Sequence, residues 1–214
     1  MVKLIIANKD DFHTQRNNLI DPADTCNVTS MINALKATGI KLPAVEGQPE
    51  DQLAKILGSR EAKDKLAKEF PSMASMPPRE VHAMLSWAVN EKLIGSKVTT
   101  FSLSVSLQEI LFRLAQKHAA SVVSTTMTRG GHLVAIVGFS STQSIDELKN
   151  PATVSLKSVR RIYLLDSWGD WSACYDAGSS GFAVGISMQE YMSMTKPVAS
   201  ERKWAHLFSA EGVF

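Results

Sequence analysis

A cysteine at the expected start of an amphipathic helix is the first candidate for chemistry in this chain. Cys26 follows Asp24 and Thr25, two residue types that cap helix N-termini. The apolar residues after it fall three and four positions apart, as one face of a helix requires: Val28, Met31, Ile32 and Leu35. We therefore expect Cys26 in the first helical turn, where free backbone N–H groups and the positive end of the helix dipole favour a thiolate. A thiol in that position has the layout of a cysteine nucleophile.

Two further candidates lie much later in the chain, on segments with the composition of strands. His132 follows Gly130-Gly131 and opens an apolar run, and Asp166 ends another apolar run. A histidine at the start of a buried strand can face a cleft, and a carboxylate at the end of the neighbouring strand can orient it. Taken singly, His132 also fits a structural histidine, Asp166 a turn residue and Cys26 a small buried hydrophobe. The order of the three predicts a thiol hydrolase with Cys26, His132 and Asp166 as catalytic residues.

The elements that must position these residues fall into two groups along the chain. Helical patterns come first, over residues 27–39, 50–93 and 107–118. Segments rich in β-branched and aromatic residues with Gly-rich turns follow, over 120–126, 132–139, 159–166 and 182–187. Helices followed by strands are typical of an α+β fold. We expect one domain over residues 1–214, with a helical insertion at roughly 45–118 that governs substrate choice.

Three phrases in the sequence carry a resemblance to a known family. They are Thr14-Gln15-Arg16-Asn17-Asn18 with Asp21-Pro22 and Thr25-Cys26-Asn27-Val28-Thr29-Ser30, then Gly131-His132 before an aliphatic strand and Gly138, then Asp166-Ser167-Trp168-Gly169. In this order they resemble a C39-like cysteine peptidase of the papain-like superfamily. Asn27 and Val28 stand where members of that family often have Gly and Pro.

The resemblance implies a fold and a mechanism. The fold would be papain-like, with the Cys26 helix packed on an antiparallel sheet that carries His132 and Asp166. His132 would take the proton of Cys26, and the thiolate would attack an amide carbonyl to form a thioester. Gln15 would donate to the oxyanion, with Asn18 as the alternative donor. This chemistry requires no cofactor and no metal, and its partner would be a peptide or protein substrate.

Composition limits the other possibilities. A net charge of +2 gives no reason to expect binding to nucleic acid or stable membrane association. The apolar run at residues 4–7 is too short for the core of a signal peptide. We therefore expect a cytoplasmic protein, or one released without a signal peptide, as phage-encoded and secretion-system-delivered proteins are. The sequence has two cysteines, Cys26 and Cys174, which we expect to be free thiols in a reducing compartment. One disulfide between them is also compatible with the sequence.

Two other functions fit the same residues. The same Cys–His pair in a peptidoglycan amidase or endopeptidase would cleave stem peptides instead of proteins. A papain-like domain with an inert thiol would be a binding module. The sequence leaves the substrate and the oligomeric state open.

Overall fold

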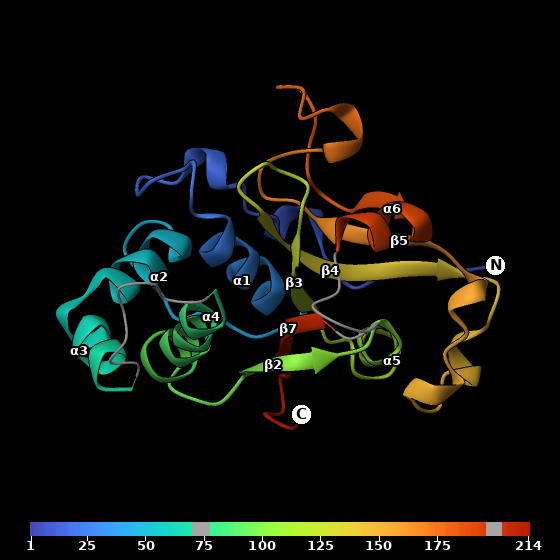
Figure 1. The fold of residues 1–214 in the computed structure, drawn as a ribbon, viewed down its shortest axis with the longest axis horizontal. Helices are drawn as coiled ribbons and strands as arrows, with labels where there is room; N and C mark the ends of the chain where they lie inside the picture. The colour runs from blue at the N-terminus through green and yellow to red at the C-terminus, as the bar shows by residue number, and fades with distance from the viewer. Residues whose placement is uncertain (70–77, 196–202) are drawn as a thin grey trace.

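The computed structural model describes residues 1–69, 78–195 and 203–214, and its centre is a seven-stranded antiparallel sheet (Figure 1). The strands along the main path lie in the order β2-β7-β3-β4-β5-β6, and β1 pairs with the far half of β4. Their bounds are β1 Val2–Ile5, β2 Thr99–Val105, β3 Ser121–Thr125, β4 His132–Ser141, β5 Val159–Leu165, β6 Val184–Ser187 and β7 Lys203–Phe208.

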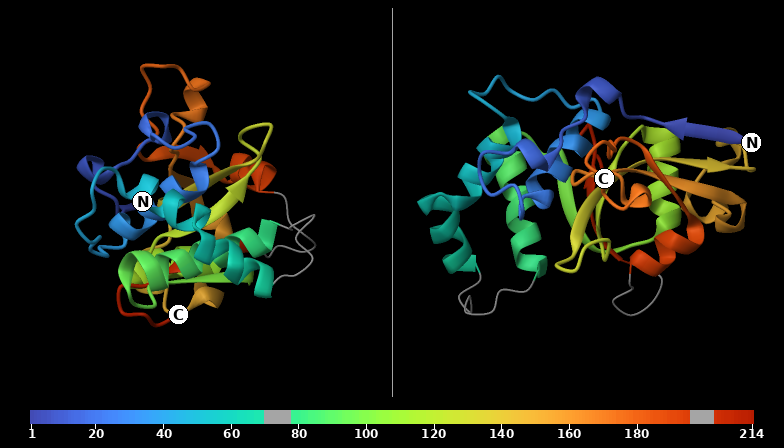
Figure 2. Two further views of the ribbon diagram at one scale, coloured as in Figure 1. Left: turned by 90° about the vertical axis from the view of Figure 1, so that its left-hand side faces the viewer. Right: turned by 90° about the horizontal axis from the view of Figure 1, so that it is seen from above.

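Helices cover both faces of this sheet. The α-helices are α1 Cys26–Ala37, α2 Pro49–Gly58, α3 Arg60–Glu69, α4 Pro78–Trp87, α5 Leu107–Lys117 and α6 Met188–Met194, and α4 continues as the π-helical turn η4 Ala88–Ile94. Short 3-10 turns occupy η1 Lys9–Asp11, η2 Gln15–Asn17, η5 Ile145–Glu147, η6 Pro151–Thr153, η7 Leu156–Ser158 and η8 Trp171–Ala173. The α2–α3 pair lies at the end of the molecule opposite β1 (Figure 2). None of the described helices is both long and apolar enough to cross a bilayer.

Side-chain alternation along the strands divides the core into two layers. In β4, Leu133 and Ala135 join the layer that contains α1, α2 and α4. Val134 and Ile136 join the layer that contains α5 and α6. All ten residues of β4 are buried because helices lie on both faces of the sheet, so the strand reads as a nearly continuous apolar run. The expected α+β fold, in which a helix that begins at Cys26 packs on an antiparallel sheet, is confirmed.

Two strands differ from the sequence interpretation. The segment 45–118 was interpreted as a helical insertion, but it also contains β2, which pairs with β7 at the end of the main strand path. β2 carries only three apolar residues in seven, and its pairing shifts register between Ser102 and Val105. Neither β2 nor β7 is expected from the sequence. β2 pairs with β7, and β7 pairs with both β2 and β3, and local composition is a weak guide to such long-range pairing.

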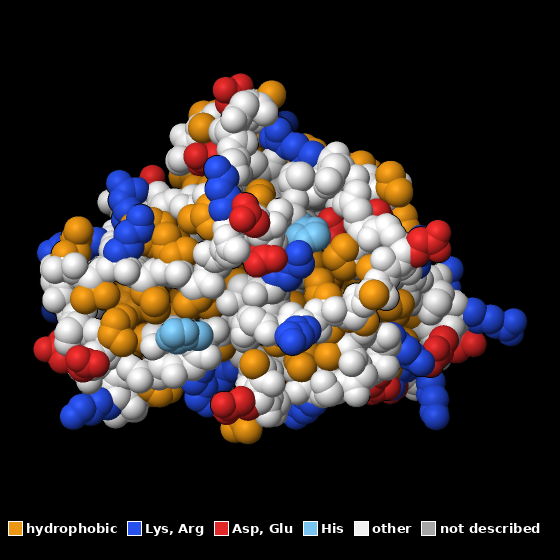
Figure 3. All heavy atoms as spheres, turned by 180° about the vertical axis from the view of Figure 1, so that it is seen from behind, with side chains coloured by type: hydrophobic (Ala, Val, Ile, Leu, Met, Phe, Trp, Pro, Cys, Tyr) orange, Lys and Arg blue, Asp and Glu red, His pale blue; other side chains and the backbone are white. Residues whose placement is uncertain are grey.

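The face opposite the view of Figure 1 carries charges of both signs. Figure 3 shows Lys and Arg side chains interspersed with Asp and Glu side chains, with hydrophobic side chains between them. Mixed charges of this kind give no strong field of one sign on that face.

Candidate active site

The nucleophile candidate lies where the sequence predicts it, at the first residue of α1. Thr25 is the residue before the helix, but its hydroxyl donates to Asp21 O at 3.0 Å and makes no capping bond. The first N–H groups of a helix have no partner within it, and the Val28 N–H is taken by Asn27 Oδ1 at 2.7 Å. This arrangement leaves the half-buried Cys26 thiol beside the N–H groups that open α1.

His132 and Asp166 form a direct, buried pair. His132 begins β4 and Asp166 follows β5, the strand next to β4 in the sheet. His132 Nε2 lies 2.8 Å from Asp166 Oδ1, and the side chains are 3% and 0% exposed. The Trp168 N–H donates to the same carboxylate oxygen at 3.1 Å. The carboxylate therefore fixes the imidazole ring and leaves Nδ1 as the ring nitrogen for another partner.

Cys26 and His132 line the same cleft, whose volume is about 420 Å³. Burial lowers the pKa of His132, but hydrogen bonds and charge interactions with Asp166 and Cys26 outweigh burial and raise the pKa to about 9. An imidazole with this pKa carries its proton at neutral pH. The structure thus brings together Cys26, His132 and Asp166, the three residues proposed from the sequence as catalytic.

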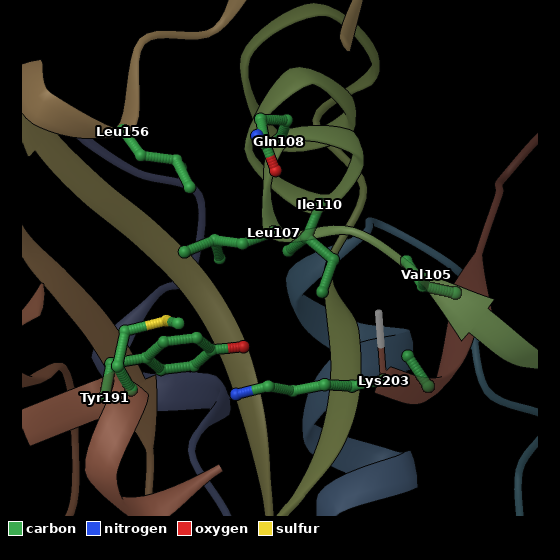
Figure 4. Close-up of a pocket in the computed structure, with 9 residues that line it drawn as sticks. Val105, Leu107, Gln108, Ile110, Leu156, Tyr191 and Lys203 are labelled. Carbon is green, nitrogen blue, oxygen red and sulfur yellow. The ribbon is translucent and has the colours of Figure 1, made fainter. Parts of the chain in front are cut away.

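A second, much smaller cavity lies elsewhere in the structure. Figure 4 shows this cavity, which is lined by residues of β2, α5, α6 and β7 and in which Lys203 extends toward the Tyr191 ring. The volume of this cavity is about 40 Å³. The Lys203 Nζ lies 4.9 Å from the centre of that ring and also bonds the Thr195 hydroxyl. A space that holds about one water is a gap in packing rather than a ligand site.

The two oxyanion-donor candidates are buried and already hydrogen-bonded. Gln15 Nε2 donates to Pro22 O at 2.8 Å and to Ala23 O at 3.4 Å, and its Oε1 accepts from the Ser167 hydroxyl at 2.6 Å. Asn18 Nδ2 donates at 2.9 Å to each of two threonine hydroxyls at the base of α1, those of Thr25 and Thr29. Neither residue is among those that line the cleft in the described part of the chain. Gln15 as the donor stays a prediction.

Tyr175 is a neighbour of the site that the sequence interpretation did not include. Burial first, and then the Asp166 carboxylate, raise the pKa of its phenol. Its hydroxyl and Asp166 Oδ2 are both buried without a hydrogen-bond partner among the described residues. The Tyr175 backbone is left-handed, with φ of 61°, and its carbonyl accepts from Arg16 at 3.1 Å. A left-handed tyrosine in a Gly- and Ser-rich loop gives no local signal in the sequence, because its role depends on how that loop folds back on Asp166, nine residues earlier.

Gly181 is the second residue near the site whose role only the fold makes visible. Its carbonyl accepts from the Asp166 N–H at 2.8 Å, and a Cβ at this position would overlap the Asp166 backbone. Only a glycine lets the returning chain approach Asp166 so closely.

The described residues offer neither a cluster of metal ligands nor a disulfide at this site. Among residues 1–69, 78–195 and 203–214, no group of three or more His, Cys, Asp or Glu side chains is placed to hold a metal ion. Both cysteines are free thiols, so the bridge that the sequence left open does not form.

Comparison with known proteins gives one match. The model of the Peptidase_C39 like family matches residues 9–200. Neither the curated proteins nor the solved structures gave a significant match. The family match covers most of the chain and spans α1, β4 and the Asp166 turn, which together build the cleft described above. The chain belongs to the Peptidase_C39 like family.

Proposed function

We propose that this protein is a cysteine peptidase that hydrolyses amide bonds through a thioester on Cys26. The observation that carries the proposal is the buried 2.8 Å bond between His132 and Asp166, at a cleft that Cys26 also lines. An imidazolium beside Cys26 stabilises a thiolate, and the N-terminus of α1 acts in the same direction. Membership of the family supports a peptidase in general, and the geometry supports these three residues in particular.

The reaction then runs in two steps. In the first, the Cys26 sulfur bonds to the amide carbonyl, His132 donates its proton to the amine, and the C–N bond breaks. In the second, His132 takes a proton from water, the hydroxide oxygen bonds to the thioester carbon, and the C–S bond breaks to release the acid. Asp166 stays ionised and holds the ring in place through both steps.

The oxyanion would be stabilised by the Cys26 backbone N–H and by Gln15. The 3.4 Å bond from Gln15 to Ala23 O is the longest made by the two candidate amides, so it is the least costly to exchange for an oxyanion. Asn18 would have to give up one of two shorter hydrogen bonds, both 2.9 Å long, to reach the oxyanion. We expect Gln15→Ala to lower kcat by about 10²–10³. A mild effect of Gln15→Ala together with that loss in Asn18→Ala would assign the donor to Asn18.

The test of the nucleophile is selective alkylation. At about pH 6.5, iodoacetamide should modify Cys26 much faster than the exposed Cys174, because Cys26 lies beside His132 at the N-terminus of α1 and Cys174 does not. Cys174→Ser should retain hydrolysis of a small activated ester, and Cys26→Ala should abolish it. Equal labelling of the two thiols together with no ester turnover would instead favour a binding module. Cleavage of isolated peptidoglycan but of no protein would favour the wall amidase or endopeptidase.

A further inference from the structure

A second set of buried imidazoles lies beside the cleft, and nothing in the proposed mechanism uses it. His206 in β7 is fully buried and joins Ser86 on one side and His82 on the other. Its Nδ1 lies 3.0 Å from the Ser86 hydroxyl, and its Nε2 lies 3.3 Å from His82 Nδ1. This chain of contacts fixes the ring of His82 in one orientation.

Aromatic rings hold His82 from the other directions. The centre of the His82 ring lies 4.0 Å from that of Trp204 and 5.6 Å from that of Phe101. Phe101 in β2 is paired with His206 in β7, and their rings are 5.1 Å apart. His82 and Trp204 are therefore parts of a rigid ring cluster, not two separate side chains on a mobile surface.

This cluster reaches the cleft of the proposed active site. His82 and Trp204 line it together with Cys26, His132 and Gly131. The strand order explains the arrangement, because β3 separates β7 from β4 and so sets Trp204 two strands away from His132. Gly130 and Gly131 also line the cleft and carry no side chain, and a Cβ at Gly131 would meet only Thr125 O, at 3.9 Å. The cleft that the rings and the glycines line therefore has room for a substrate side chain.

The rings form an uncharged wall. Burial lowers the pKa of His82 to about 4. Burial together with the charge of His82 lowers the pKa of His206 well below its ordinary value of 6.5. At neutral pH both rings are neutral. Among the described residues that line the cleft, Asp24 is the one carboxylate, and no Lys or Arg lines it. The charged groups of the cleft, Asp24 and the His132 imidazolium, are not part of the ring cluster, so this neutral planar wall suits an apolar group.

We propose that His82 and Trp204 form a specificity subsite that takes an apolar, preferentially aromatic, side chain of a peptide substrate next to the scissile bond. This inference rests on the proposed function, since it concerns the substrate of the same cleft. The subsite determines which peptides are bound and takes no part in bond breaking. Ser86 and His206 are positioning residues, because they act through the His82 ring.

The experiment compares peptide choice with ester turnover. A peptide library that fixes one residue at a time around the cut should show about tenfold higher kcat/KM for Phe or Trp than for Gly, Asp or Lys at one position. Trp204→Leu should lower kcat/KM for the Phe and Trp peptides by about tenfold. The kcat/KM for the Gly, Asp and Lys peptides should fall much less, so Trp204→Leu should lose most of the preference for aromatic residues.

Trp171→Leu is the matched control. Trp171 packs partly buried against the other core layer and does not line the cleft, so the same change there should preserve the preference. A wild-type preference that survives Trp204→Leu, or a library without aromatic preference, would overturn the subsite while Cys26-dependent ester turnover still supported the peptidase. Ester turnover that survives Cys26→Ala would refute the peptidase itself.

If no peptide is cut, NMR titration of the Cys26→Ala protein with N-acetyl-phenylalaninamide tests the subsite directly. Shifts absent from the Cys26→Ala/Trp204→Leu protein support the subsite, and equal shifts refute it.

Discussion

Two buried hydrogen-bonded pairs in the described structure, His132–Asp166 and His206–His82, differ in the charge of the partner of the histidine. His132 is bonded to the Asp166 carboxylate, whereas His206 is bonded to the neutral Ser86 hydroxyl and the His82 ring. Burial acts on both, yet the pKa of His132 rises to about 9 and that of His206 falls well below 6.5. A buried imidazole thus becomes an acid–base group only where a negative charge compensates its lost hydration. The two pairs lie at one cleft, one suited to chemistry and the other to recognition.

The largest difference between the two pairs should appear in turnover. We expect His132→Ala to lower kcat for a small ester by about 10²–10⁴, the range that a general acid–base group contributes. His206→Gln should stay within about threefold of wild type, because His206 reaches the cleft only through His82. Steady-state kinetics on folded variants, with circular dichroism as the check of folding, measures both. A hundredfold loss in His206→Gln would mean that the wrong imidazole has been given the role of base.

Removing the charge of the Asp166 carboxylate should remove the difference in pKa between the two buried histidines, His132 and His206. In Asp166→Asn, burial remains but the negative charge is lost, so the pKa of His132 should fall from about 9 toward or below 6.5. The pH dependence of the imidazole NMR signals reports this change directly. If the pKa stayed near 9, Cys26 rather than Asp166 would be the group that stabilises the imidazolium.

The neutral pair should be visible in the acid stability of the fold. The pKa of His82 is about 4 in the folded protein against 6.5 as its ordinary value, so the unfolded chain binds more protons between these two pH values. The free energy of unfolding should therefore fall as the pH drops from 6.5 to 4, with a contribution from His82 of about 3 kcal/mol. Urea unfolding across this range should show a smaller loss in His82→Gln. His118→Asn, a change at an exposed histidine, should keep the wild-type loss.

The smallest effect is expected at Tyr175, whose phenol is influenced by the Asp166 carboxylate. Tyr175→Phe removes a buried hydroxyl that has no hydrogen-bond partner among the described residues. Because no hydrogen bond is lost, we expect the free energy of unfolding to change by less than about 1 kcal/mol. Ester turnover should fall by less than about tenfold, since Oδ1 still holds His132. A much larger loss of turnover with normal stability would give Tyr175 a direct part in orienting the triad.

What could be predicted from the sequence follows from how local each signal is. Some patterns lie within a short stretch of sequence, namely the helical periodicity after Cys26 and the apolar runs after His132 and before Asp166. These patterns predict α1, β4 and β5 close to their observed bounds. The approach of Tyr175 and Gly181 to Asp166 depends on how a long loop folds back, and no spacing rule encodes it. The contact of His82 with His206 depends on β7 lying beside β2 and β3, a pairing of segments about 100 residues apart in sequence. The sequence therefore predicts the candidate catalytic residues Cys26, His132 and Asp166. It does not predict that His82 and Trp204 line the cleft.

The position of β7 has a consequence for how the protein is made. β7 is the last strand in the sequence but an inner strand of the sheet, between β2 and β3. During synthesis, β2 and β3 therefore wait with unpaired edges until residues 203–208 have been translated, and such edges can pair with other chains. Trp204 arrives with the same strand. The cleft thus gains Trp204 only when the sheet closes, so a nascent chain already contains Cys26, His132 and Asp166 before it contains the ring that completes the proposed subsite.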